Sequence, residues 1–167
     1  MLDDQDRARW DRELIAVAVE RLDRHPASDP DGPLGPYRAQ AEIARLHAVA
    51  PTAPDTDWPR ILAIYRGLQA STDSPVVALN AAVAVAMVEG PESGLAEIDG
   101  LAAAGGLDDY YLLHSARGDL LRRLERDDEA ASAYRQALAT VGTSPERRFL
   151  ERRLAEVAGS IVPEDRP

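Results

Sequence analysis

The sequence predicts an all-α fold of antiparallel helical hairpins, with about eight helices stacked in chain order. Apolar residues recur every three or four positions through most of the chain, which is the period of a helix that buries one face. Clusters of proline and glycine interrupt this pattern at intervals of one helix length. No segment shows the alternation of apolar and polar residues that is typical of a strand. Short breaks between the helices favour antiparallel neighbours.

The first helix is expected to begin near the N-terminus. Asp3 or Asp4 is a suitable cap, and the helix runs to about Arg24, where the proline at position 26 ends it. Its apolar positions at helical spacing are Trp10, Leu14, Val17 and Leu22. The stretch 26–35 holds three prolines and two glycines and is therefore predicted to be a loop.

The second and third helices flank a proline-containing break at 51–57. The second runs from Pro36 to about Ala50, since proline suits the first turn of a helix. Asp57 is a good cap for the third. Part of the apolar face of the second helix is supplied by Ile43, Leu46 and Val49. The buried candidates of the third are Ile61, Leu62, Ile64, Tyr65 and Leu68.

The fourth helix, from Pro75 to Glu89, has an unusual composition. Between positions 76 and 88 its only polar side chain is Asn80, and a helix that is apolar all round is buried on most sides. We therefore place this helix at the centre of the fold. A buried Asn80 needs a hydrogen-bond partner, either to fix helix register or to hold a peptide backbone in a groove.

Four more helices complete the expected fold, and they lie at 92–104, 108–124, 127–141 and 145–157. The glycine pair at 105–106 stops the first of them. The last has one apolar stripe and an otherwise charged surface, as expected of a helix that caps a stack. The predicted organisation is an N-terminal helical subdomain over 1–73, repeats with a capping helix over 74–158, and a frayed tail over 159–167.

The second half contains a repeat. The segment Tyr111–Gly142 matches the tetratricopeptide pattern of about 34 residues, which forms a short superhelix of stacked hairpins. Gly118 stands where close helix packing needs a small residue, and Ala130, Tyr134 and Ala137 give the small–aromatic–small spacing of the second helix. A degenerate copy lies one repeat earlier. Its Ala84, Ala96 and Ala103 fall on Gly118, Ala130 and Ala137.

Composition excludes several classes of function. The 167 residues carry 29 acidic and 19 basic side chains, all the basic ones being arginine, for a net charge of -10. This balance argues against a free-standing nucleic-acid binder, which needs a basic surface. The absence of cysteine excludes disulfides and cysteine-ligated metal sites. The charged start and the short longest apolar run, 81–88, indicate a cytoplasmic location.

No catalytic pattern is present in the sequence. The three histidines have no second histidine at metal-ligand spacing. Capping or solvent exposure is expected for His25, a structural role for His47, and a groove or packing role for His114. There is neither a glycine-rich phosphate loop nor a GxSxG nucleophile motif. We therefore expect no enzyme activity, no metal site and no cofactor.

Several short segments, spread over nearly the whole chain, carry a family resemblance. They are Asp4–Arg12, Gly35–Tyr37, Gln40-Ala41, His47-Ala48, Asp55–Trp58, Pro75–Asn80, Ala82–Ala86, Tyr111–His114 and Glu146–Leu154. In this order and spacing they resemble the C-terminal extension of a subgroup of extracytoplasmic-function sigma factors of RNA polymerase. The resemblance covers positions 2 to about 157.

The resemblance implies a regulatory helical region with tetratricopeptide-like repeats that follows two sigma domains. The partners it implies are the sigma DNA-binding domains of the parent chain or RNA polymerase, with no direct contact to nucleic acid or membrane. Relatives usually have arginine after the asparagine of the central helix, where this chain has Ala81, so any contact made by that arginine is missing. The 167 residues hold no sigma domain, which implies either a piece of a longer protein or a stand-alone relic.

Two functions from different classes follow as expectations. The first is a protein-interaction and regulatory domain acting in transcription initiation. Its candidate partner groove consists of Ala78, Asn80, Ala81, Val85, Leu112, His114, Ser115 and Asp119. The alternative is a domain that senses a small ligand in a pocket between its two halves. Its candidate pocket residues are Trp10, Tyr37, His47, Trp58 and Tyr65.

Overall fold

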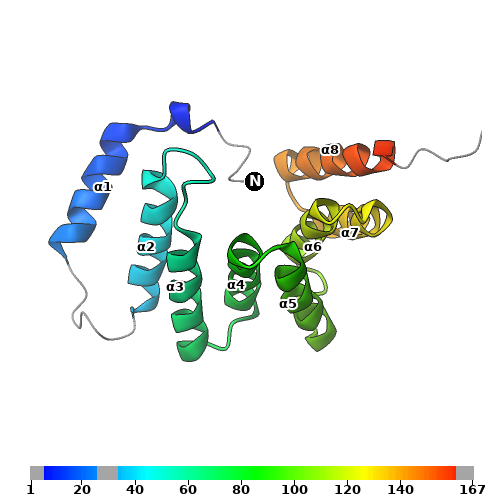
Figure 1. Cartoon of the computed structure of the whole chain (residues 1–167), viewed down its shortest axis with the longest axis horizontal. Helices are drawn as coiled ribbons and strands as arrows, with labels where there is room; N and C mark the ends of the chain where they lie inside the picture. The colour runs from blue at the N-terminus through cyan, green and yellow to red at the C-terminus, as the bar shows by residue number, and fades with distance from the viewer. Residues whose placement is uncertain (1–5, 26–33, 161–167) are drawn as a thin grey trace, which may run out of the picture. The chain divides into compact units, whose positions relative to one another are not determined.

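The computed structural model describes residues 6–25 and 34–160, and within these ranges the chain is all-α (Figure 1). A short 3-10 turn, η2 (Arg7–Arg9), precedes eight α-helices, and the described ranges contain no strand. The helices are α1 (Arg12–Arg24), α2 (Pro36–Val49), α3 (Trp58–Ser71), α4 (Pro75–Val88), α5 (Pro91–Ala104), α6 (Tyr111–Arg123), α7 (Asp127–Thr140) and α8 (Ser144–Ser160). The predicted fold class and helix number are confirmed.

Some sequence predictions fall on residues that the structure does not describe. These are the caps Asp3 and Asp4, positions 26–33 of the predicted loop, and positions 161–167 of the predicted tail. The tail was expected to begin at 159, but α8 continues to Ser160.

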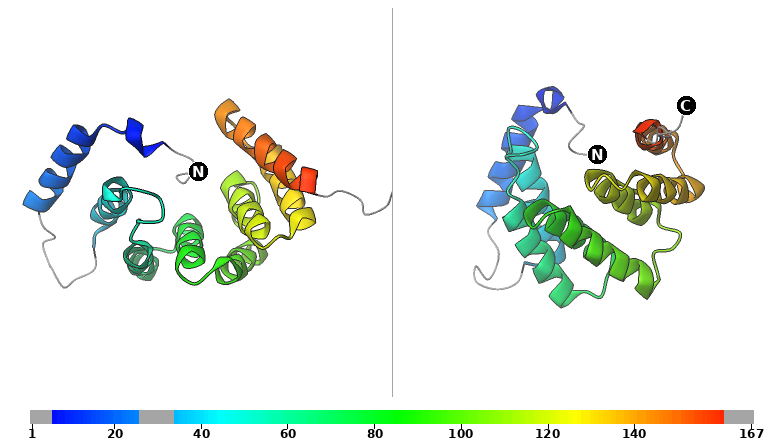
Figure 2. Two further views of the ribbon diagram at one scale, coloured as in Figure 1. Left: turned by 45° about the horizontal axis from the view of Figure 1, so that its top comes forward. Right: turned by 45° about the vertical axis from the view of Figure 1, so that its right-hand side comes forward.

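The chain forms two compact units, unit 1 (Met1–Val77) and unit 2 (Ala78–Pro167). In unit 1, α1 packs on α2 and α2 on α3. In unit 2, α5 packs on α6, α6 on α7 and α7 on α8. The helices of each unit therefore pack in chain order, as stacked hairpins do (Figure 2).

The first helix begins later than the sequence predicts. Asp11 caps α1 by accepting a hydrogen bond of 2.9 Å from the Leu14 backbone N–H, and Asp6 caps η2 in the same way through Ala8. Each aspartate satisfies a free N–H at the start of its own short element, which divides the segment into a turn and a helix. No residue of α1 is buried, and Leu14 is 66% exposed.

The bounds of α2 and α3 agree closely with the prediction. Asp57 caps α3 through the Arg60 backbone N–H at 3.0 Å. The core positions of these helices are Ala39, Ile43, Leu46, Ile61, Ile64 and Leu68. Val49 was expected to be buried but is exposed, since it is the last residue of α2 and lies past its apolar face.

Helix α4 is buried along most of its length, as its composition predicts. Its buried residues are Leu79, Ala81, Ala82, Ala84, Val85 and Ala86. The expectation of a buried Asn80 is wrong, because this side chain is exposed.

The core of unit 2 is built around Tyr134, which is 0% exposed. A Cβ atom added to Gly118 would lie only 2.8 Å from the Tyr134 ring, so a glycine is required for α6 and α7 to approach this closely. Ala130 and Ala137 on α7 are also fully buried. The small–aromatic–small spacing predicted for the repeat is therefore confirmed.

The degenerate copy of the repeat holds only in part. Ala84 is buried, but Ala96 and Ala103 are exposed, so α5 does not use the positions that α7 uses. The tight contact between α4 and α5 lies instead at Gly94, where a Cβ atom would be 2.4 Å from Ala86 Cβ. Without an aromatic ring to accommodate, this pair of helices packs at a different point.

The connection between α5 and α6 is longer than expected. Gly105 and Gly106 both have positive φ, 77° and 87°, and end α5 as predicted. Helix α6 then begins at Tyr111 and not at Asp108. The backbone carbonyl of Asp108 bonds to His114 Nε2 at 2.8 Å, which holds positions 108–110 in a turn ahead of the helix.

Candidate functional site

The candidate groove residues all belong to unit 2, but they differ in exposure. Asn80 and Leu112 are exposed, whereas Ala81, Val85 and Ser115 are buried. Asp119 accepts a hydrogen bond from Arg122 at 2.8 Å, and His114 is bonded to the carbonyl of Asp108. Ala78, near the start of α4, is half-buried. Asn80 and Leu112 are therefore the side chains of this set that a partner reaches most directly.

The candidate pocket residues all belong to unit 1. The rings of His47 and Trp58 meet edge to face, with centroids 5.1 Å apart. Tyr65 is half-buried, and burial raises the pKa of its hydroxyl. Tyr37 is 92% exposed, so it lines no enclosed space.

Trp10, the fifth of these residues, contacts a side chain that sequence reasoning missed. The guanidinium of Arg7 lies 5.0 Å from the centre of the Trp10 ring. Arg7 is only 7% exposed and donates hydrogen bonds to the carbonyls of His47, at 3.0 Å, and Ala50, at 2.8 Å. A third bond, 3.4 Å long, reaches Thr56 Oγ1. Arg7 therefore joins η2 to the end of α2 and to the connection that follows.

The same arrangement recurs at two other helix ends. In each case one arginine binds two carbonyl oxygens three residues apart at the C-terminus of a helix, and we call it an arginine clamp. Among the described residues the clamps are Arg7 on His47 and Ala50, Arg38 on Leu22 and His25, and Arg147 on Leu138 and Val141. The last carbonyls of a helix lack partners and carry its negative dipole end, and a forked guanidinium satisfies two of them together.

Two of the clamps hold α1 against α2 at opposite ends. Arg38, on the first turn of α2, binds the end of α1, with a distance of 2.8 Å to the Leu22 carbonyl. Arg7 and Arg12, which flank the start of α1, bind carbonyls at the end of α2, Arg12 more weakly at 3.4 Å to Ala48. Helix α1 is therefore attached by hydrogen bonds at its two ends.

Between these ends the two helices leave an apolar cleft. Its volume is about 250 Å³. The described residues that line it are Ile15, Ala18, Val19 and Leu22 of α1 with Ala41, Ala44, Arg45 and Ala48 of α2. None of the five candidate pocket residues is among them. No sequence motif marks this cleft, although the alanines of α2 at spacings of three and four indicate a face without large side chains.

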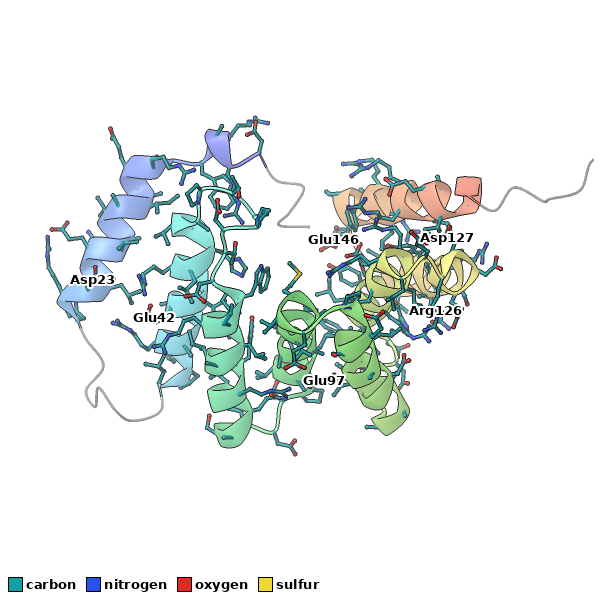
Figure 3. All side chains as sticks on the ribbon, viewed as in Figure 1. Asp23, Glu42, Glu97, Arg126, Asp127 and Glu146 are labelled. Atoms are coloured by element: carbon teal, nitrogen blue, oxygen red, sulfur yellow. The ribbon has the colours of Figure 1, made fainter. Side chains whose placement is uncertain are left out.

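A charged group lies on α2 beside this cleft. Glu42 accepts hydrogen bonds from Arg38, at 2.7 Å, and from Arg45 Nε, also at 2.7 Å, and Figure 3 labels it on α2. Burial by itself raises the pKa of Glu42, but the bonds and charges of Arg45 and Arg38 outweigh that effect and lower it below 4.5. Two guanidinium groups share one carboxylate, so the group keeps a net positive charge.

A second polar contact joins α6 to α8 in unit 2. The Tyr111 hydroxyl donates to Glu146, which also accepts a hydrogen bond from Thr143. Burial, together with the Glu146 carboxylate, raises the pKa of Tyr111 to about 12, so its proton stays in place at neutral pH. Figure 3 shows Glu146 at the first turn of α8. This contact fixes the start of the last helix.

The described residues, 6–25 and 34–160, offer no metal site. Among them, no three or more histidine, aspartate or glutamate side chains are grouped so that they could hold a metal ion. No helix there is long and apolar enough to cross a membrane.

Comparisons with known proteins give one informative match. The chain is 40% identical over 158 residues to an uncharacterized protein of Rhizobium meliloti (strain 1021). The match covers 95% of this chain but only 36% of that relative, which is therefore more than twice as long. The chain matches no known protein family, and no solved structure is significantly similar.

Proposed function

We propose that this chain is the regulatory, protein-interaction extension of an extracytoplasmic-function sigma factor, acting in transcription initiation through the sigma domains or RNA polymerase. The observation that carries the proposal is the ordered set of segments from Asp4–Arg12 to Glu146–Leu154. Several of these segments form the contacts that join helices, including the Arg7 clamp and the edge contact of His47 with Trp58. A non-enzymatic role in the cytoplasm is part of the same proposal.

The surface of unit 1 supports a role in protein contact. Leu14 and Val17 lie one helical turn apart on α1, and both are exposed. An exposed apolar stripe on a helix is a common contact surface for a partner protein. Removing this stripe from water supplies the apolar part of the binding energy.

The charge of the chain supports a basic partner. A net charge of -10 attracts a basic DNA-binding domain and competes with DNA for it. The length of the Rhizobium meliloti relative also fits the proposal, since it leaves room for further domains beside the region matched here.

The experiment is a binding assay of this chain against separately expressed sigma domains and against RNA polymerase core enzyme. We expect binding that weakens as salt rises, because exposed charges are screened. The double variant Leu14→Glu with Val17→Glu should weaken it, whereas Ala16→Glu, at an exposed position of the same helix, should not. Absence of binding to both partners, with unchanged promoter activity after deletion of this region from the parent protein, would refute the proposal.

A further inference from the structure

The cleft between α1 and α2 is open because the side chains that line it leave its volume unfilled. Three alanines of α2, Ala41, Ala44 and Ala48, line one wall with short side chains. Ile15 and Val19 of α1 line the other wall and are only half-buried. A helix pair without a ligand normally closes such a gap, because an unfilled apolar space loses packing contacts.

The clamps explain how the gap stays open. Arg38 holds one end of the pair and Arg7 holds the other, through bonds to helix carbonyls. These bonds fix the ends of α1 relative to α2 without requiring the middle of the two helices to touch. The result is a pocket whose walls are preformed, which is the usual state of a small-ligand site.

One charged side chain, Arg45, lies on the lining of the cleft and can orient a bound ligand. Arg45 uses its Nε atom to bind Glu42, and within the described residues its two terminal nitrogens have no hydrogen-bond partner in the chain. The lining is otherwise aliphatic. Because Arg38 and Arg45 share the single carboxylate of Glu42, an additional anion is favoured beside Arg45 on the wall of the cleft.

We propose that this cleft binds a small amphiphilic anion, with its hydrocarbon part between α1 and α2 and its carboxylate on the terminal nitrogens of Arg45. The walls remove the hydrocarbon from water, and the guanidinium offers the two parallel donors that a carboxylate accepts. The lining of this site includes neither Leu14 nor Val17. This proposal is a form of the ligand-sensing alternative, but it places the ligand at other residues than the sequence predicts. It does not depend on contact with sigma domains.

The test uses decanoate as the probe and decanol as its uncharged counterpart, both below the concentration at which they aggregate, with the full chain. Calorimetry should show one decanoate per chain, and the melting temperature should rise as decanoate is added. Amide NMR shifts should be confined to α1 and α2. No saturable binding, or shifts spread over unit 2, would overturn the proposal.

Two matched pairs of variants locate the site. Arg45→Gln should weaken decanoate binding about tenfold or more and leave decanol unchanged, since it removes a charged donor, whereas Arg21→Gln on the exposed surface of α1 should do neither. Ala41→Leu should fill the cleft and abolish binding of both probes, while Ala16→Leu should not. Helical content measured by circular dichroism shows whether each variant is folded. If Arg45→Gln and Arg21→Gln bind decanoate equally, or Ala41→Leu still binds, the site is not the cleft. Binding to anionic lipid vesicles without binding to free decanoate would equally refute it.

Discussion

Units 1 and 2 are both stacks of helices with arginine clamps, but they differ in how much apolar burial holds their outermost helices. In unit 2 the last helix, α8, buries Leu150 and Val157 in the same core that contains Tyr134. In unit 1 the first helix, α1, buries no residue, and the clamps of Arg7 and Arg38 attach it to α2. The last helix of unit 2 is therefore held by apolar packing in addition to the Arg147 clamp, whereas the first helix of unit 1 is held mainly by hydrogen bonds to backbone carbonyls.

This difference predicts which helices contribute most to the stability of each unit. Fully burying a large apolar side chain contributes roughly 1.5–3 kcal/mol, whereas a hydrogen bond adds a net of about 0.5–1.5 kcal/mol. Unit 2 accumulates many burials, so it should unfold as one cooperative body. Helix α1 depends on a few bonds and should open locally at lower free energy than the rest of the chain.

The largest effect is expected at Tyr134. Tyr134→Ala should lower the free energy of unfolding of unit 2 by about 3–5 kcal/mol, because it removes a fully buried ring and leaves a cavity beside Gly118. Tyr37→Ala, which removes a 92% exposed ring in unit 1, should change stability by less than about 0.5 kcal/mol. Urea denaturation measures both. Equal effects of the two substitutions would remove the contrast between the units.

Gly94 provides the next largest effect and an internal control. Gly94→Ala should cost about 1–3 kcal/mol, because its new Cβ would lie 2.4 Å from Ala86 Cβ and 2.9 Å from the Ala82 carbonyl oxygen. Gly100→Ala, on the same helix with nothing within 4 Å, should instead stabilise by about 0.5–1 kcal/mol. Thermal unfolding of the two variants should move in opposite directions. A common direction would mean that α4 and α5 do not meet at Gly94.

A smaller, local effect is expected at the clamp of Arg7. Arg7→Lys keeps the charge but removes the fork, so it should cost about 1–2 kcal/mol through lost bonds to His47 and Ala50. Amide hydrogen exchange should speed up at the end of α2 and in η2 while unit 2 is unaffected. Arg9→Lys, at an exposed position of the same turn, serves as the control. Faster exchange throughout unit 2 would show that the clamp is not local.

Much of this fold could be predicted because its causes are local in sequence. Asp57 caps α3, Gly105 ends α5, and the spacing of Ala130 and Tyr134 places one face of α7 in the core, all as the residues themselves indicate. The repeat pattern also predicts a small residue at Gly118, although its contact with the Tyr134 ring is seen only in the structure. Such features depend on backbone conformation and helical periodicity, and a single sequence records both.

The features of unit 1 could not be predicted because they depend on partners far apart in sequence. Arg7 and His47 are forty positions apart, and an arginine that binds carbonyls leaves no pattern in the residues it binds, since every residue has a carbonyl. The cleft has the same origin, as alanines on one helix become a wall only once the clamps set the other helix. The prediction that Asn80 is buried was wrong for a related reason, because the sequence of a uniformly apolar helix does not indicate which side of the helix is exposed.

The smallest effect, and the one that isolates the attachment of α1, is expected from acid. Folding lowers the pKa of Glu42 below its ordinary value of 4.5. The ionised carboxylate therefore stabilises unit 1 at pH values above 4.5. That contribution is lost as the pH falls through the lowered pKa, and protonation then releases Arg38 and Arg45. Amide exchange in α1 should therefore gain a pH-dependent opening below pH 4.5.

Glu42→Gln removes the titrating group, so the same opening should be present in this variant already at neutral pH and should change little on acidification. Glu129 and Glu146 in unit 2 also have lowered pKa values, the first through Arg126 and the second through Thr143 and Tyr111, so global stability falls in acid in either protein. Only the amide exchange of α1 distinguishes the original chain from the Glu42→Gln variant. If α1 in Glu42→Gln keeps the acid response of the original chain, Glu42 does not hold the clamp in place, and the Arg38 bonds to Leu22 and His25 act alone.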